Sequence, residues 1–213
     1  MNRKFSIIYL GLSLIYLAAM NREPFVASWL LKIAPLSVIF YLLVTLLKGK
    51  VRLLTAAAVL LSMSGDILLN LDFFIPGLAS FLVAQVFYSS IFVQNHHSLR
   101  HRWPLLIVLV LHLFLMAYLL TPVLEDLWLP VMAYLVVIGT MGVTAVMSNY
   151  PTRWLVVGAF IFVLSDSLIA TNKFLMPFVW ADGLIMSTYY MAQLAILYSL
   201  LAYHRADEGF VEQ

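Results

Sequence analysis

Residues 153–172 read RWLVVGAFIFVLSDSLIATN, and this stretch decides the fold class. It is long enough to cross about 30 Å of hydrocarbon as a helix, which takes roughly 20 residues. Its apolar run continues unbroken from Trp154 to Leu164 and is soon followed by an ionisable residue, Asp166. A charged side chain at membrane depth costs at least about 2.5–3.5 kcal/mol on insertion scales. The stretch therefore predicts a transmembrane helix and marks its carboxyl group as a candidate functional residue.

The composition of the whole chain also predicts a membrane protein. Of its 213 residues, 64% are hydrophobic and 10% are charged, against about 45–50% and about 25% in soluble domains. A chain of this size has too little interior to bury so much apolar surface in water. The 12 lysines and arginines are scattered between apolar runs, and they form no stripe that could follow a phosphate backbone. Composition thus excludes a soluble enzyme, a disordered chain and a nucleic-acid-binding protein, and the lack of cysteine excludes thiolate chemistry.

Eight apolar stretches follow one another along the chain, separated by short polar breaks. They lack the alternation of membrane β-strands, so helices are expected. We predict one all-α domain over residues 1–213, a polytopic membrane bundle of eight transmembrane helices. The first stretch also resembles a secretory signal, but Ala18-Ala19-Met20 is a poor cleavage site, so a retained helix is expected. The predicted spans are Phe5–Met20, Trp29–Leu47, Val51–Leu69, Pro76–Gln94, Trp103–Thr121, Leu127–Met147, Arg153–Asn172 and Asp182–Tyr203.

The basic residues of the short connections predict the orientation, because cytoplasmic loops carry the excess of lysine and arginine. We expect an integral, multi-pass protein of a bacterial inner membrane with both termini in the cytoplasm. The connections are too short for a soluble domain, so function is expected within the bilayer or at its edge. Nine basic residues fall on the side of the termini and two on the other: Arg3, Lys4, Lys48, Lys50, Arg52, Arg100, Arg102, Arg153 and Arg205, against Arg22 and Lys173.

Three charged residues at membrane depth stand out, and all lie in the non-cytoplasmic halves of their predicted spans: Lys32, Asp66 and Asp166. Asn70 follows Asp66 by four residues and therefore shares its helix face. The pattern predicts one internal polar pocket that opens toward the outer leaflet. Its further lining is expected from the polar residues Asn70, Gln85, Tyr88, Asn172, Lys173, Tyr189, Tyr190 and Gln193.

Structural interpretations of the same residues remain open. Lys32 lies near the end of its predicted helix, so its ammonium group could reach the interface. One carboxylate could pair with Lys32 only to hold helices together. Tyr189 and Tyr190 could belong to the aromatic belt of the membrane. The spans contain no cluster of histidines and carboxylates with the spacing of metal ligands, so no metal is expected.

A short sequence pattern occurs twice along the chain. Ser64-Gly65-Asp66 is followed by a proline and then by Gln85, and Ser165-Asp166 is followed by a proline and then by Gln193. The third and fourth predicted spans thus resemble the seventh and eighth. The repeat predicts two parallel four-helix halves with the two aspartates at equivalent depths around one interface.

Five stretches in this order resemble the YhhN family of membrane proteins, the lysoplasmalogenases, and the resemblance covers nearly the whole chain. They are KIAPL at 32–36, SGDILL at 64–69, FLVAQVFY at 81–88, GAFIFVLSDS at 158–167 and STYYMAQL at 187–194. The resemblance implies hydrolysis of the vinyl ether bond of lysoplasmalogens, which are lysophospholipids of the bilayer. The products are a fatty aldehyde and a glycerophospho-alcohol, and no metal or organic cofactor is needed.

The residues can support this chemistry. A vinyl ether is hydrolysed by protonation of its β-carbon, and water then attacks the α-carbon of the oxocarbenium ion. One carboxyl group must be protonated and a second ionised, as in glycosidases. Burial favours the protonated form and a nearby ammonium the ionised form. Our hypothesis assigns the acid to Asp166 and the base to Asp66, with Lys32 or Lys173 deciding which stays ionised.

The other polar residues are expected to bind water and the glycerophospho headgroup. Lys173 would receive the phosphate, and Asn70, Tyr189, Tyr190 and Gln193 would donate or accept hydrogen bonds. The apolar interior of the bundle would hold the alkenyl chain.

Two other functions compete with hydrolysis. Repeats and buried carboxylates are also typical of proton-coupled small-molecule or lipid transporters. That alternative predicts helices broken by glycine or proline at the substrate site, and near the polar cluster only Pro35 lies inside a span. A third possibility is a lipid-binding or assembly protein in which the aspartates only hold helices together.

Overall fold

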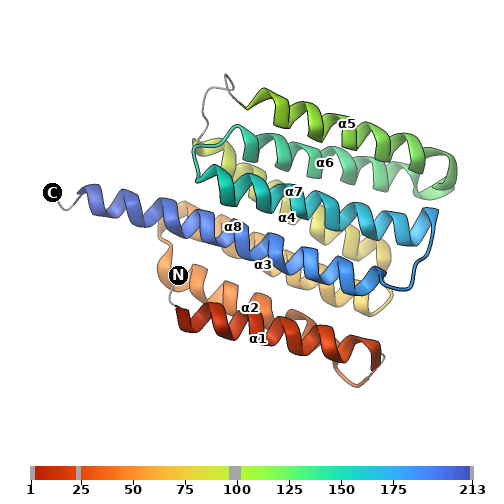
Figure 1. Ribbon diagram of the computed structural model, residues 1–213, viewed down its shortest axis with the longest axis horizontal. Coiled ribbons are helices and arrows are strands. Elements are labelled where there is room, and N and C mark those ends of the chain that lie inside the picture. The colour runs from red at the N-terminus through yellow and green to blue at the C-terminus, as the bar shows by residue number, and fades with distance from the viewer. Residues whose placement is uncertain (1–2, 23–24, 96–101, 212–213) are drawn as a thin grey trace.

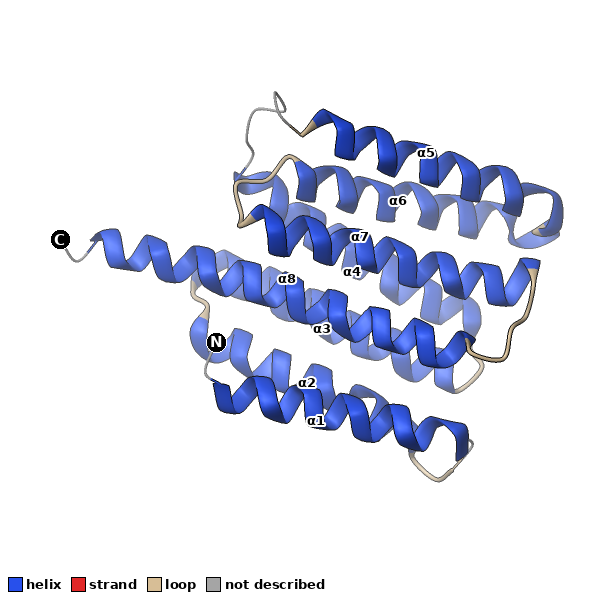
Figure 2. Ribbon diagram, in the orientation of Figure 1, coloured by secondary structure: helices blue, strands red, loops and turns tan. Residues whose placement is uncertain are grey.

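The computed structural model describes residues 3–22, 25–95 and 102–211. Within these ranges the chain forms helices and short connections without a strand, which confirms the predicted all-α class (Figure 2). The α-helices are α1 (Arg3–Ala19), α2 (Ser28–Leu46), α3 (Gly49–Asn70), α4 (Phe74–Phe92), α5 (Trp103–Leu120), α6 (Trp128–Val146), α7 (Thr152–Ala170) and α8 (Ala181–Val211).

Each predicted span corresponds to one α-helix. Seven of the helices in the described residues, α2 to α8, are long and apolar enough to cross a membrane. Helix α1 has 17 residues, which is at the lower limit of spanning length. It packs against α2 and α8, and the Tyr9 hydroxyl donates a 2.7 Å hydrogen bond to the backbone carbonyl of Tyr190. The chain is therefore an integral, multi-pass membrane protein.

All predicted helix ends but one lie within two residues of the observed ends, and two of the differences are informative. Helix α8 continues past Tyr203 to Val211, because polar residues lead a helix out of the membrane without ending it. Helix α7 ends at Ala170, two residues before the predicted end, and passes into a π-helical turn, Thr171–Leu175. Such turns occur frequently at functional sites.

The packing of the helices repeats after four helices. In the first half α1 packs on α2, α2 on α3 and α3 on α4, and the same neighbours meet in the second half from α5 to α8. The halves also meet in an equivalent way, since α4 packs on α6 and α8 packs on α2. Successive helices alternate in direction, and both described ends of the chain lie at the same end of the bundle (Figure 1). This arrangement is the one expected for two parallel halves.

The helix pairs α3/α4 and α7/α8 approach each other most closely, and each pair contains a glycine on α3 or α7. A Cβ atom at Gly65 would lie 2.6 Å from the ring of Phe81 on α4. A Cβ atom at Gly158 would lie 3.1 Å from the backbone carbonyl of Ala192 on α8. Small residues at such contacts let transmembrane helices pack backbone to backbone.

One interhelical hydrogen bond fastens each of these pairs. Ser80 on α4 donates to the carbonyl of Leu61 on α3 at 2.7 Å. Ser165 on α7 donates to the carbonyl of Ile185 on α8 at 3.0 Å. The two pairs therefore form a rigid frame that carries Asp66 on α3 and Asp166 on α7.

Helix α3 ends in a Schellman turn at the end of the bundle away from the termini. The amide of Phe73 donates to the carbonyl of Leu68 at 2.8 Å, and that of Asp72 donates to Leu69 at 3.2 Å. Asp72 adopts a left-handed conformation with φ 63°, which aspartate tolerates better than most residues. The turn places Asn70, Asp72 and Phe74 around one opening, described below.

Replacing Gly158 by leucine is expected to lower the free energy of unfolding by about 1–3 kcal/mol, because overpacking at a backbone contact cannot be relieved by a side-chain shift. Thermal unfolding in detergent micelles measures the effect. Gly11→Leu is the matched control, since a Cβ atom at Gly11 has nothing within 4 Å. Equal melting temperatures for the two variants would contradict the close packing of α7 on α8.

Candidate functional site

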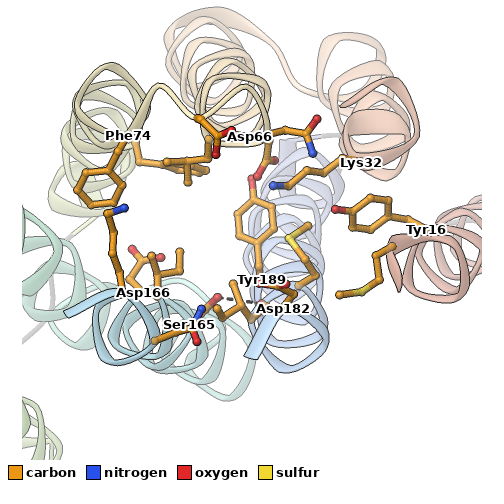
Figure 3. A pocket seen from close by; sticks show the side chains of 18 residues that line it. Tyr16, Lys32, Asp66, Phe74, Ser165, Asp166, Asp182 and Tyr189 are labelled. Carbon is orange, nitrogen blue, oxygen red and sulfur yellow. Dashed lines mark hydrogen bonds between the residues drawn. The ribbon is translucent and has the colours of Figure 1, made fainter. Parts of the chain in front are cut away.

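A cavity of about 520 Å³ opens at the end of the bundle away from the termini. Its walls come from α1, α2, α3, α4, α7 and α8 (Figure 3). Asp66 is only 3% exposed and Asp166 is half-buried, whereas Asp72, Lys173 and Asp182 are exposed. The cavity therefore has carboxyl groups at its floor and charged residues of both signs at its rim.

Asp66 and Asp166 lie in the same cavity, although 100 residues separate them in the sequence. They enter from opposite walls, Asp66 from α3 and Asp166 from α7 (Figure 3). The two groups are close enough for their charges to repel each other. The structure thus brings two carboxyl groups from distant parts of the chain into one site.

Asp66 has a cation and a hydroxyl group as neighbours. The ammonium group of Lys32 on α2 attracts the Asp66 carboxylate, and the Tyr189 hydroxyl on α8 points toward it (Figure 3). Neither Asp66 Oδ2 nor the Tyr189 hydroxyl has a hydrogen-bond partner of good geometry among the described residues. Both atoms are buried, and the Tyr189 hydroxyl interacts with the Asp66 carboxyl group.

Asp166 has a neutral partner, Tyr134, which was not predicted from the sequence. The hydroxyl group of Tyr134 on α6 donates a hydrogen bond to Asp166 Oδ2. Tyr134 is buried. It lies six residues after the start of α6, and Asp166 lies six residues before Asn172, the predicted end of its span. Equal depth in neighbouring helices was thus the available signal, although tyrosine is too common in membrane helices to stand out without it.

The cavity gathers seven of the residues that the sequence predicted for a site. They are Lys32, Asp66, Asn70, Asp166, Asn172, Lys173 and Tyr189. Besides Asp166, three of them are held by neighbours, and Asn172 accepts a 3.2 Å hydrogen bond from the amide of Phe178. Asn70 accepts a 3.0 Å hydrogen bond from Ser28 at the start of α2, and Lys173 places its ammonium 4.4 Å from the ring centre of Phe74.

Four other predicted residues, Gln85, Tyr88, Tyr190 and Gln193, are not in the cavity lining and lie buried behind it. The Tyr88 hydroxyl donates a 2.7 Å hydrogen bond to Gln193 Oε1, and the Tyr190 hydroxyl donates to the carbonyl of Lys32 at 2.6 Å. In this structure these four residues hold together the helices that form the cavity walls, and they do not line the cavity itself. Tyr190 in particular fixes the segment of α2 that carries Lys32.

The arrangement suits proton transfer to and from a neutral molecule. Asp66 lies beside a cation, whereas Asp166 is bonded to a neutral hydroxyl group. If Tyr134 holds one oxygen of Asp166, the other oxygen is left to carry a proton toward the cavity. Two carboxyl groups with such different surroundings can act as an acid and a base.

The sequence is similar to a family of known proteins over most of its length. Residues 27–200 match the model of the YhhN family. The chain is 34% identical to "Lysoplasmalogenase TMEM86A" of Homo sapiens over 136 residues, which are 60% of this chain and 55% of that protein. It is 31% identical to "Lysoplasmalogenase TMEM86B" of Mus musculus over 183 residues, 84% of this chain and 77% of that protein.

A bacterial relative is similar to the same degree. The chain is 31% identical to "Lysoplasmalogenase" of Mycobacterium bovis over 137 residues, 60% of this chain and 52% of the relative. The match thus spans about half the length of the human TMEM86A protein and of the mycobacterial protein. No solved structure matches the chain.

The bond between Tyr134 and Asp166 is expected to couple the two residues energetically. Tyr134→Phe and Asp166→Asn should each lower the free energy of unfolding, and the double variant should lose less than the sum by about 1–3 kcal/mol. A double-mutant cycle of thermal unfolding in detergent measures this term. Tyr118→Phe is the control, because Tyr118 is 77% exposed on α5. Additive effects of Tyr134→Phe and Asp166→Asn would contradict the contact.

Proposed function

The chain belongs to the YhhN family, and from this premise we propose that it hydrolyses the vinyl ether bond of lysoplasmalogens to a fatty aldehyde and a glycerophospho-alcohol. Relatives named lysoplasmalogenase support the proposal. The observation that carries it is the pair of carboxyl groups in one membrane cavity, one beside a cation and the other bonded to a neutral hydroxyl. Acid and base are both needed to cleave a vinyl ether by water.

In the first step Asp166 gives its proton to the β-carbon of the vinyl ether. The C=C electron pair forms the new C–H bond, and the ether oxygen shares the positive charge that remains on the α-carbon. Asp166 becomes a carboxylate, which the Tyr134 hydroxyl stabilises through its hydrogen bond. The Asp66 carboxylate stabilises the cation electrostatically, as the second carboxylate does in glycosidases.

In the second step water attacks the α-carbon while Asp66 takes a proton from it. The product is a hemiacetal, and Asp66 is now protonated. Tyr189 and Asn70 line the same cavity and would orient this water. Positioned proton transfer of this kind contributes about 10²–10⁴-fold to a rate.

In the third step the hemiacetal collapses and the two carboxyl groups exchange roles. Asp166 removes the proton of the hemiacetal hydroxyl, the C–O bond to glycerol breaks, and Asp66 protonates the departing oxygen. The aldehyde and the glycerophospho-alcohol leave, while Asp166 is again protonated and Asp66 again ionised. Atoms and charges balance with water as the one co-reactant.

The rim of the cavity offers contacts for the polar part of the substrate. Lys173 is exposed there beside Phe74, and Lys32 lies deeper. Both can attract a phosphate group, while Asn172 can hydrogen-bond the glycerol hydroxyls. A headgroup at the rim and a reacting bond at the floor would place the substrate along the membrane normal, as in the bilayer.

The cavity is proposed to open on the non-cytoplasmic side. It lies at the end of the bundle away from the termini (Figure 1), and the connections at the end of the termini carry most of the basic residues. This orientation places both termini in the cytoplasm. The bilayer would be a bacterial inner membrane.

A proton-coupled transporter is the alternative. It predicts a substrate site at a discontinuous helix, but α2 runs without interruption from Ser28 to Leu46 through Pro35. The π-helical turn that follows α7 lies at a helix end rather than in the middle of a span. The assay below distinguishes the two functions, because a transporter releases no aldehyde.

Purified protein supplied with a lysoplasmalogen is expected to release fatty aldehyde. Asp66→Asn and Asp166→Asn should each reduce the rate by about 10²–10⁴-fold, because each removes one partner of the proton transfers. Aldehyde trapped as a hydrazone measures the rate. Asp126→Asn, an exposed loop carboxylate, should leave it unchanged. Full activity in folded Asp66→Asn and Asp166→Asn variants would contradict the mechanism.

The orientation can be tested with single cysteines, because the chain has none of its own. Val179 is 94% exposed at the cavity end, so Val179→Cys should react with a membrane-impermeant maleimide applied to spheroplasts. Asn149→Cys, at the opposite end, should react only after the membrane is permeabilised. The reverse pattern would contradict the proposed topology.

A further inference from the structure

A second, smaller crevice adjoins the main cavity between α4, α6 and α7. Its volume is about 50 Å³. Of its walls, only Tyr134 and Asp166 bear polar side-chain atoms, and the remainder are apolar: Leu69, Phe74, Leu78, Phe81, Val131, Ile169, Ala170 and Phe174. Leu78, Ala170 and Phe174 are only half-buried. These three residues also pack against the buried cluster of Met116, Leu120, Leu124 and Val131, so the crevice lies in an apolar part of the bundle.

The crevice and the main cavity adjoin and share part of their walls. Five residues line both: Leu69, Phe74, Phe81, Asp166 and Ile169. Asp166 is the one ionisable residue common to the two linings, whereas Asp66 and Lys32 line only the main cavity. The two spaces thus meet at one carboxyl group, with polar walls on one side of it and apolar walls on the other.

We propose that this apolar crevice binds the first carbons of the alkenyl chain of the substrate, with the rest of the chain extending into the bilayer. The inference rests on the proposed function. A lysoplasmalogen is polar on one side of its vinyl ether and a long hydrocarbon on the other. The molecule matches the two linings when the headgroup lies in the main cavity, the chain enters the crevice and the reacting bond lies at Asp166.

This placement also selects the acid. In a vinyl ether the β-carbon bears the hydrocarbon chain and the α-carbon bears the oxygen of the headgroup side. The carboxyl group at the mouth of the crevice, Asp166, therefore faces the β-carbon, which must be protonated. Asp66, which lies away from the crevice, faces the α-carbon, where water attacks. The position of the apolar crevice assigns the acid to Asp166 and the base to Asp66. The difference between the neighbours of the two aspartates leads to the same assignment.

The experiment compares two substrates that differ only in their chain. Ala170→Phe fills the crevice, so kcat/KM for a hexadecenyl substrate should fall by about tenfold or more relative to that for a propenyl analogue. The propenyl analogue has a single methyl group beyond the β-carbon and does not need the space. Ala79→Phe makes the same change at an exposed position of α4 and should leave the ratio unchanged.

A second variant guards against misfolding of the first. Leu78→Ala enlarges the crevice, so it should raise the kcat/KM for a chain branched next to the double bond relative to a straight chain. The proposal would be overturned if Ala170→Phe left the hexadecenyl-to-propenyl ratio of kcat/KM at its wild-type value and Leu78→Ala left the branched-to-straight ratio at its wild-type value. If the proposed function itself were wrong, the result would be different, because wild type would then release aldehyde from none of these substrates.

Discussion

The structure depends on one constraint, the large free-energy cost of a charged group in hydrocarbon. Lys32, Asp66 and Asp166 come from three different helices, and each would be unfavourable alone on a lipid-facing surface. In the bundle they line one polar cavity with an opening. The cost is thus offset by mutual attraction, by hydrogen bonds and by access to water, and the apolar helices around them can remain apolar.

The two aspartates occupy corresponding positions in the two halves of the bundle but have different neighbours. The cavity therefore contains two unlike carboxyl groups. Helices α3 and α7 carry the aspartates at corresponding places in the two halves, each fastened to its following helix. The preceding helices differ, because α2 contributes Lys32 and α6 contributes Tyr134. A symmetrical pair would share its proton equally. The difference between a cation and a hydroxyl would permit the acid and base roles proposed for the two aspartates.

Much of the architecture followed from the sequence, because hydrophobic length and isolated charges are strong signals in a membrane protein. The eight helices and the gathering of Lys32, Asp66 and Asp166 were predicted in this way. The bond from Tyr134 and the exclusion of Gln85 from the cavity lining were not. Both depend on the rotation of each helix about its axis, which glycines and interhelical hydrogen bonds set, and hydropathy carries no information about that rotation.

Transfer of a proton to carbon is the central chemical claim, and hydrolysis in D₂O tests it most directly. Protonation of the β-carbon by an exchanged carboxyl group predicts an aldehyde with a single deuterium at the carbon next to its carbonyl, added to one face. Reduction of the aldehyde to the alcohol as it forms preserves the label for mass spectrometry. An aldehyde released without deuterium at that carbon would contradict acid catalysis at the vinyl ether.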